Sequence, residues 1–202
     1  KIENLDVSEL TDLICLDVSK CTHLENLLCG GNKTCNHATK NKQNSDLTIH
    51  YCSIDDNNRP IDHKLTSLNV SGCTNLKSLD CSRTSLTFLD LSGCQSLTFL
   101  SCSYSKLTEL NLSNIKNLNI LSCYANPKLT SINISNCNDL TFIDADQNPK
   151  LTTFNVSNCA NLTAIYCCES PKLAQINTSN CDNLETLCTD ECITLRFLKC
   201  VN

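Results

Sequence analysis

Apolar residues recur along this chain in a fixed frame, Leu-x-x-Leu-x-(Val/Cys), which appears twice in each unit of 21 or 22 residues. The frame restarts at Leu65, Leu86, Leu107, Leu129, Leu151, Leu173 and Leu195. Its alternation of apolar and polar positions predicts short strands. A unit of this length cannot close a core alone, so neighbouring units must stack and bury a shared one. The pattern therefore predicts a solenoid.

The N-terminal third keeps this frame less strictly. Residues 1–33 repeat it with irregular spacing, whereas residues 34–64 depart from it and hold one candidate strand at 47–52. We interpret 34–64 as an irregular repeat that carries an insertion. The prediction is a single domain, 1–202, of about nine coils, in which 195–202 is a truncated last repeat.

The segment LNILSCYAN (118–126) resembles the leucine-rich repeat signature, with Cys at one core position. Together with the period and the Leu-x-Val-Ser half of each unit, it makes the chain similar to internalin-type surface proteins, particularly their cysteine-ladder branch. The resemblance implies a leucine-rich repeat solenoid of the right-handed β/α superhelix class. Its parallel strands would be joined by short turns or 3-10 segments in place of full helices. An extracellular or cell-surface location is implied in the same way.

Either half of the unit could line the concave side, because LTFLDLSGC (86–94) also resembles cysteine-containing repeats of eukaryotic leucine-rich proteins. Variation between the repeats favours one assignment. The Leu-Thr-x-Leu-Asn-Val-Ser half keeps a monotonous outward row of Thr and Asn, which suits a structural side. We expect the Ser hydroxyl that follows to cap the next turn by accepting a backbone N–H. The other half varies, so we assign it to the concave, partner-binding side.

The variable half carries aromatic and apolar residues at its outward positions. An exposed patch of this kind on a rigid sheet usually marks a binding surface. The candidate partner-binding residues are Tyr51, Phe99, Tyr104, Ile120, Tyr124, Phe142, Asp144 and Tyr166. A second interpretation stays open, in which the rings pack sideways on one another and only cover the sheet.

Composition narrows the classes of function. The net charge is −5, which argues against a nucleic-acid partner. No apolar run approaches the length of a membrane span, so we expect no membrane insertion. We find no Ser/His/Asp arrangement, phosphate-cradling glycine loop or metalloprotease helix, and so expect that the chain is not an enzyme and has no cofactor. We also expect a monomer. Because the sequence starts at Lys1 without Met, we expect a processed or excised piece.

Eleven of the 18 cysteines occupy two recurring slots. One slot holds Ala145 or Thr189 in two repeats, and the other holds Ile115 in one. A disulfide does not tolerate such a replacement on one side, whereas a small buried residue does, so we predict free core thiols. These cysteines are Cys29, Cys81, Cys102, Cys123 and Cys167 in the first slot, and Cys21, Cys73, Cys94, Cys137, Cys159 and Cys181 in the second.

The remaining cysteines leave alternatives open. Cys35 and Cys52 lie close to His37 and His50 in the sequence, which is compatible with a zinc site, a disulfide or irregular packing. The register of the 47–52 strand decides which side chains it buries. Three others, Cys168, Cys188 and Cys192, gather near the C-terminus, where a bridge could fasten the last coil.

The acidic residues near the C-terminus include Asp144, Asp146, Glu169, Asp190 and Glu191. We interpret them first as solvated positions, and only second as calcium ligands. We therefore predict no resident metal.

The leading functional hypothesis is a non-enzymatic recognition or adhesion module that binds a protein or glycan on the concave aromatic face. One alternative is an intracellular or immune-type leucine-rich module that uses the other face. Another is ice binding through the Thr/Asn row. The fold itself does not decide among them, because one architecture serves many partners.

Overall fold

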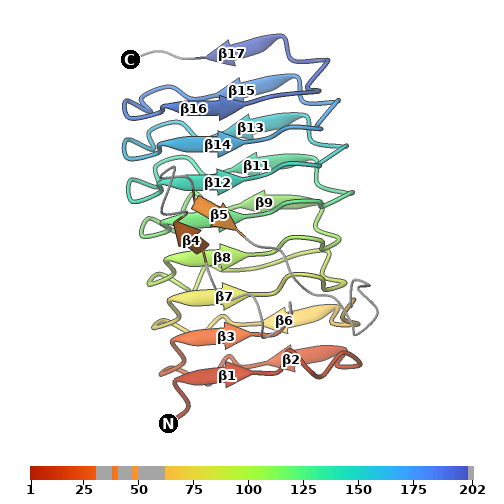
Figure 1. Cartoon of the computed structure of the whole chain (residues 1–202). Coiled ribbons are helices and arrows are strands. Elements are labelled where there is room, and N and C mark those ends of the chain that lie inside the picture. Colours follow the sequence, from red (N-terminus) through yellow and green to blue (C-terminus); the bar gives the residue numbers. More distant parts are fainter. Residues whose placement is uncertain (31–37, 41–46, 50–61, 200–202) are drawn as a thin grey trace.

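The computed structural model describes residues 1–30, 38–40, 47–49 and 62–199. Within these residues every regular element is a strand of three residues, and short turns join the strands into stacked coils (Figure 1). The predicted fold class is confirmed as a parallel β-solenoid of about eight turns. The described part contains no helix long and apolar enough to cross a membrane.

The Leu-x-x-Leu-x-Cys halves form one parallel sheet along the whole stack. Its order is β1-β3-β7-β8-β10-β12-β14-β16. The register places the apolar residues in line, for example Leu100 opposite Leu121 and Leu121 opposite Ile143. The strands are β1 (Asn4–Asp6), β3 (Asn26–Leu28), β7 (Ser78–Asp80), β8 (Phe99–Ser101), β10 (Ile120–Ser122), β12 (Phe142–Asp144), β14 (Ala164–Tyr166) and β16 (Thr186–Cys188).

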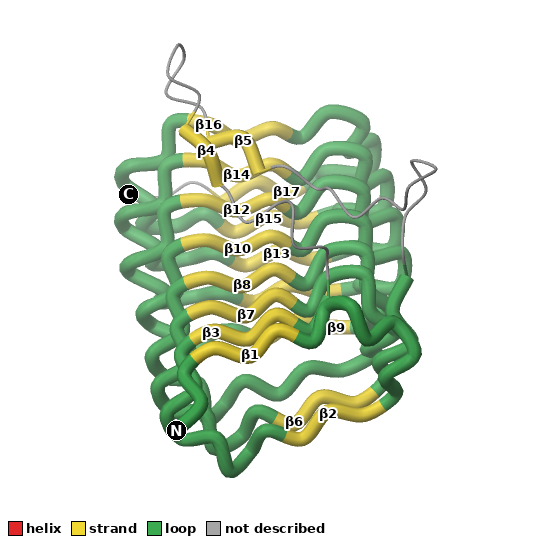
Figure 2. Tube along the Cα trace, turned by 60° about the horizontal axis from the view of Figure 1, so that its bottom comes forward, coloured by secondary structure: helices red, strands yellow, loops and turns green. Residues whose placement is uncertain are grey.

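The Leu-Thr-x-Leu-Asn-Val-Ser halves also form strands, on the opposite side of the coils (Figures 1 and 2). Five of them make a second parallel sheet in the order β17-β15-β13-β11-β9, and β2 pairs separately with β6. Strand formation therefore does not distinguish the two faces. These strands are β2 (Cys15–Asp17), β6 (Ser67–Asn69), β9 (Glu109–Asn111), β11 (Ser131–Asn133), β13 (Thr153–Asn155), β15 (Gln175–Asn177) and β17 (Phe197–Lys199).

The insertion contributes two short strands, β4 (Ala38–Lys40) and β5 (Leu47–Ile49), which pair antiparallel with each other. Figure 1 draws them in front of the eight-stranded sheet. The predicted strand at 47–52 is thus confirmed for its first three residues. Its remainder lies outside the described residues, as do Cys35, Cys52 and the question of a zinc site or bridge between them.

The core lies between the two sheets and combines leucine with cysteine. Leu100 and Leu121 of the eight-stranded sheet and Ile132 and Phe154 of the five-stranded sheet belong to one buried cluster. All eleven predicted ladder cysteines are free thiols, and ten of them are buried, Cys21 being half-buried. They pack as small hydrophobic residues, as the sequence predicts.

In several coils a cysteine thiol closes one corner. The Sγ of Cys159 donates to the carbonyl oxygen of Ile134 at 3.2 Å, and that of Cys181 to Val156 at 3.1 Å. Each bond therefore crosses from one coil to the preceding one. Desolvation raises the pKa of the Cys137 thiol to about 12, so this thiol stays protonated and can donate.

The other corner holds a second row of inward polar residues, at Thr84, Ser105, Asn126, Asn148, Ser170 and Cys192. The Nδ2 of Asn148 donates to the carbonyl oxygens of Ala145 at 2.6 Å and Cys123 at 3.2 Å, and its Oδ1 accepts the N–H of Asn126 at 3.0 Å. These bonds satisfy backbone groups that the tight turn buries.

Many of the turns on the five-stranded side of the coils are Asx turns, which corrects the expected role of serine. The Oδ1 of Asn155 accepts the backbone N–H of Ser157 at 3.2 Å, and Asp90 does the same for Ser92 at 2.9 Å. The serine is thus the backbone donor, while the preceding Asn or Asp supplies the accepting oxygen. Asx turns of this kind are typical of Asn and Asp side chains.

Threonine hydroxyls tie neighbouring coils together along the outer edge. Thr130 Oγ1 donates to the carbonyl oxygen of Thr108 at 2.9 Å, and Thr152 donates to Thr130 at 3.0 Å. The hydroxyl protons of this part of the Thr row are therefore directed into the protein. This arrangement gives the monotonous row a structural function.

Candidate functional site

The outward side of the eight-stranded sheet is ordered in columns. Strand alternation turns the residues on either side of each buried Leu or Ile away from the core. The register aligns Phe99, Ile120 and Phe142 in one column, and Ser122, Asp144 and Tyr166 in the next. We call this side the aromatic face and define it by Phe99, Tyr104, Ile120, Tyr124, Phe142 and Tyr166.

The predicted exposure is wrong for two residues of this patch. Phe142 is only 8% exposed and Asp144 only 9%, so both are buried. The other five described candidates, Phe99, Tyr104, Ile120, Tyr124 and Tyr166, are half-buried. Tyr51 lies outside the described residues.

Contact between rings of neighbouring coils is one reason why these side chains are less exposed than predicted. The centroids of Tyr104 and Tyr124 are 5.2 Å apart, and those of Phe142 and Tyr166 are 5.7 Å apart. Tilted pairs at such distances are favourable contacts. The rings therefore do pack sideways, as the second interpretation has it, and their role in partner binding remains a prediction.

A buried arginine extends the Tyr104–Tyr124 pair. The guanidinium carbon of Arg83 lies 4.0 Å from the centroid of the Tyr104 ring, within the range of a cation–π interaction. Arg83 is only 6% exposed. Burial, together with the neighbouring Tyr104, raises the pKa of Tyr124, whose phenol is therefore neutral. The three side chains therefore form a continuous row of contacts, with a cation–π contact followed by a tilted ring pair.

Sequence reasoning missed a set of serine pairs on the same face. Ser82 Oγ and Ser101 Oγ are 2.6 Å apart, and Ser103 Oγ and Ser122 Oγ are 2.7 Å apart. Each pair runs diagonally, from the position two residues beyond one strand to the last residue of the next strand. The two partners of each pair are 19 residues apart, and this recurring spacing could have indicated the pairs from the sequence.

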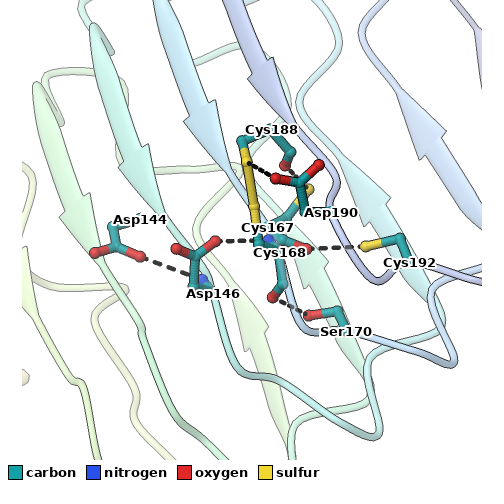
Figure 3. The surroundings of a disulfide bond; sticks show 8 residues. All are labelled: Asp144, Asp146, Cys167, Cys168, Ser170, Cys188, Asp190 and Cys192. Carbon is teal, nitrogen blue, oxygen red and sulfur yellow. Dashed lines mark hydrogen bonds between the residues drawn. A yellow bond between two sulfur atoms is a disulfide. The ribbon is translucent and has the colours of Figure 1, made fainter.

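The C-terminal end of this face carries a disulfide between Cys168 and Cys188 (Figure 3). Of the three cysteines for which the sequence left a bridge open, these two form it. Cys192 is a free, buried thiol whose Sγ donates to the carbonyl oxygen of Cys167 at 3.0 Å. It is not part of the bridge because it occupies the inward corner slot that Asn126 and Asn148 fill in earlier coils.

Carboxylates surround the disulfide. Asp146 Oδ1 accepts the backbone N–H of Cys168 at 2.6 Å, and Asp190 is exposed beside Cys188. Burial raises the pKa of Asp146 to about 6, and the charges of Asp144, Glu169 and Asp190 add to this. The end of the aromatic face is therefore an electronegative region that favours a cation or a donor-rich ligand.

The opposite face offers a small depression on the five-stranded sheet. It is lined by Thr153, Phe154, Asn155, Gln175 and Asn177 and has a volume of about 210 Å³. Pockets that bind small molecules are commonly larger than about 300 Å³. The depression is too small to enclose a drug-sized ligand or a cofactor.

Comparison with known proteins adds a distant likeness. No protein-family model matches this chain, and no curated protein matches it. Among solved structures, the chain is similar to the functional domain of InlJ from Listeria monocytogenes, which is described as including a cysteine ladder. Identity is 25%, and the match covers 99% of this chain but only 46% of that one. The TM-score of 0.33 is too low for this likeness to support an argument about function.

Proposed function

We propose that this chain is a non-enzymatic recognition and adhesion module that binds a protein or glycan partner on its aromatic face. The carrying observation is the placement of Tyr104, Tyr124 and Tyr166. All three lie half-buried on the same face. Tyrosine combines an apolar ring with a polar handle and is enriched at interfaces.

The pre-ordered rings give this face a physical advantage in binding. Arg83 and Tyr104, and Tyr104 and Tyr124, are already in contact, so a partner that binds them immobilises few additional side-chain torsions. Association loses less free energy to ordering when the binding groups are held in place beforehand. Half-buried rings present edges and part of a face, which suits a ligand that lies flat along the coils.

The neighbouring carboxylates provide polar recognition. Asp190 and Glu169 are exposed at the C-terminal end of the face. Their oxygens accept hydrogen bonds from sugar hydroxyls or from cationic side chains of a protein. The combination of ring edges and acceptors fits both partner classes, and the test below separates them.

An extracellular or cell-surface location belongs to the same proposal. Its support is the Cys168–Cys188 disulfide, since disulfides persist in oxidising compartments. The many free thiols do not oppose it. Ten of the eleven ladder thiols are buried, and burial protects a thiol from oxidants.

The test compares two variants with the wild-type chain on a glycan array and on a panel of extracellular matrix proteins. Tyr124→Ser/Tyr166→Ser removes two rings from the aromatic face. Phe88→Ser is the matched control, because Phe88 is 64% exposed and belongs to the other half of the unit. The double variant should lose at least about tenfold in affinity, while the control should bind like the wild type.

Circular dichroism and urea unfolding establish that both variants are folded. Full binding by a folded double variant would contradict the assignment to the aromatic face. Loss of binding in Phe88→Ser alone would move the site to the other half of the unit. The array that carries the wild-type signal identifies the partner as glycan or protein.

A further inference from the structure

The two sulfurs of the C-terminal disulfide lie next to the exposed carboxylate of Asp190. Cys168 Sγ, Cys188 Sγ and a carboxylate oxygen of Asp190 are all within 4.8 Å of one another. Cys188 Sγ and Asp190 Oδ2 are 3.8 Å apart, and Figure 3 shows the carboxylate directed at this sulfur. Cysteine thiolates and carboxylate oxygens are both ligand types that zinc uses in proteins.

The fold holds these two positions together without a covalent bond. Cys168 lies two residues beyond β14 and Cys188 is the last residue of β16. This is the same diagonal that joins Ser82 to Ser101 and Ser103 to Ser122, where the side chains meet through hydrogen bonds alone. Reduction of the disulfide therefore leaves two thiols side by side.

The distances fit a single ion after small side-chain rotations. Zn–S bonds of about 2.3 Å in a tetrahedral site place two sulfurs about 3.8 Å apart. The Cα atoms of Cys168 and Cys188 are 5.9 Å apart, close enough for both side chains to reach one ion.

The surroundings of the sulfurs attract a cation and leave it accessible. Cys168 and Cys188 are half-buried and Asp190 is exposed, so solvent can supply the fourth ligand of an open site. Asp146 and Glu169 add negative charge nearby. The thiol of Cys192 is excluded, because it is buried and donates to the carbonyl oxygen of Cys167.

We propose that Cys168, Cys188 and Asp190 form a redox-gated site for a soft divalent cation, with zinc as the best match. In the oxidised state both sulfurs are bonded to each other and cannot bind zinc as thiolates. A small dithiol reduces the bond: its two thiols become a disulfide, and Cys168 and Cys188 each gain a hydrogen. Zinc then replaces the two thiol protons, which pass to the buffer, while Asp190 adds its oxygen.

The test measures zinc binding to the whole chain by equilibrium dialysis in both redox states, after the dithiol has been removed under nitrogen. The reduced wild-type chain should bind one more zinc ion than reduced Cys168→Ser or Cys188→Ser, with release of about two protons per ion. Asp190→Asn should weaken this binding at least about tenfold. Cobalt added in place of zinc should show a thiolate-to-metal absorption band that both cysteine variants lack.

Two variants serve as matched controls. Cys15→Ser removes an exposed free thiol near the other end of the solenoid, and Asp182→Asn removes an exposed carboxylate outside the cluster. Both should bind zinc like the wild type. Because the cysteine variants keep all other thiols, zinc bound elsewhere in the chain contributes equally to the wild type and to each variant, and does not affect the difference between them.

Three results would overturn the proposal. The first is equal zinc binding by reduced wild-type and Cys188→Ser chains. The second is equal binding by the oxidised and reduced wild-type chains. The third is loss of folded structure on reduction, measured by circular dichroism, because the site requires the fold alone to hold the two thiols together.

Discussion

The inward corner residue Asn148 should contribute more to stability than any exposed asparagine of the turns. Its side chain is completely buried, with two N–H donors and one carbonyl acceptor. Asn148→Ala removes all three. The carbonyl oxygens of Cys123 and Asp146 each keep a second donor, namely Asn126 Nδ2 at 3.0 Å and the N–H of Ala125 at 2.9 Å. The loss therefore falls on the carbonyl oxygen of Ala145 and the N–H of Asn126.

The expected size follows from these two groups. A buried backbone group that loses its partner destabilises the fold by about 1–3 kcal/mol. Two such groups give a decrease of about 2–6 kcal/mol in the free energy of unfolding. Asn148→Ser should recover part of it, because Ser170 occupies the same slot one coil later and its Oγ accepts the backbone N–H of Asn148 at 3.3 Å, as a serine at position 148 would accept that of Asn126.

Urea unfolding followed by far-ultraviolet circular dichroism measures the effect. The control is Asn138→Ala, at an exposed turn position, which should change the free energy of unfolding by less than about 0.5 kcal/mol. The predicted order of stability is wild type and Asn138→Ala, then Asn148→Ser, then Asn148→Ala. Equal stability of Asn138→Ala and Asn148→Ala would refute the role given to the corner row.

Two further predictions concern thiols and pH. Alkylation of the native protein should label Cys15 quickly, whereas all eleven ladder cysteines should react after non-reducing denaturation; fewer than about eight labelled sites would contradict free core thiols. Burial raises the pKa of Asp80 from 3.8 to about 6. The stability gained from protonated Asp80 in the fold is therefore fully present below pH 4 and is lost as the pH rises through 6. Asp80→Asn should therefore stabilise the protein at pH 7 by up to about 3 kcal/mol, since one pKa unit corresponds to about 1.4 kcal/mol, as measured by urea unfolding at several pH values. The matched Asp90→Asn should destabilise it, because hydrogen bonds from Ser92 lower the pKa of Asp90, and the same sign for both variants would refute this reasoning.

The repeat and its thiol core could be predicted because each depends on pattern alone. A period of 21–22 residues with a doubled apolar frame leaves stacking as the way to bury the leucines. The occurrence of Ala145 and Ile115 in otherwise cysteine slots showed that those slots need a small or apolar side chain, not a bridge. Both inferences compare repeats within the chain, so they do not need coordinates.

The contents of the outer face could not be predicted in the same way. Whether a ring at an outward position is exposed depends on its neighbours, and Phe142 is buried in a row where Phe99 is half-buried. The choice of Cys168 and Cys188 as the bridged pair depends on the diagonal between adjacent coils, which appears only once the register of β14 and β16 is known.

The corner residues illustrate a third limit. Asn126 belongs to the recognised repeat signature, but its partners come from two different coils, Cys102 and Cys123. The serine of each Asx turn was assigned the accepting role that the preceding Asn or Asp takes. Local propensity marks both residue types as turn formers, yet it does not say which side chain accepts.

The central claim, that the aromatic face binds the partner, is tested most directly by side-chain footprinting of the complex. Hydroxyl-radical labelling of the chain with and without the partner identified on the arrays reports the accessibility of each ring. We predict that Tyr104, Tyr124 and Tyr166 become protected, while Phe88 and Phe197, both exposed in the free chain, react as before. Protection of Phe88 or Phe197 with unchanged labelling of the three tyrosines would contradict the account.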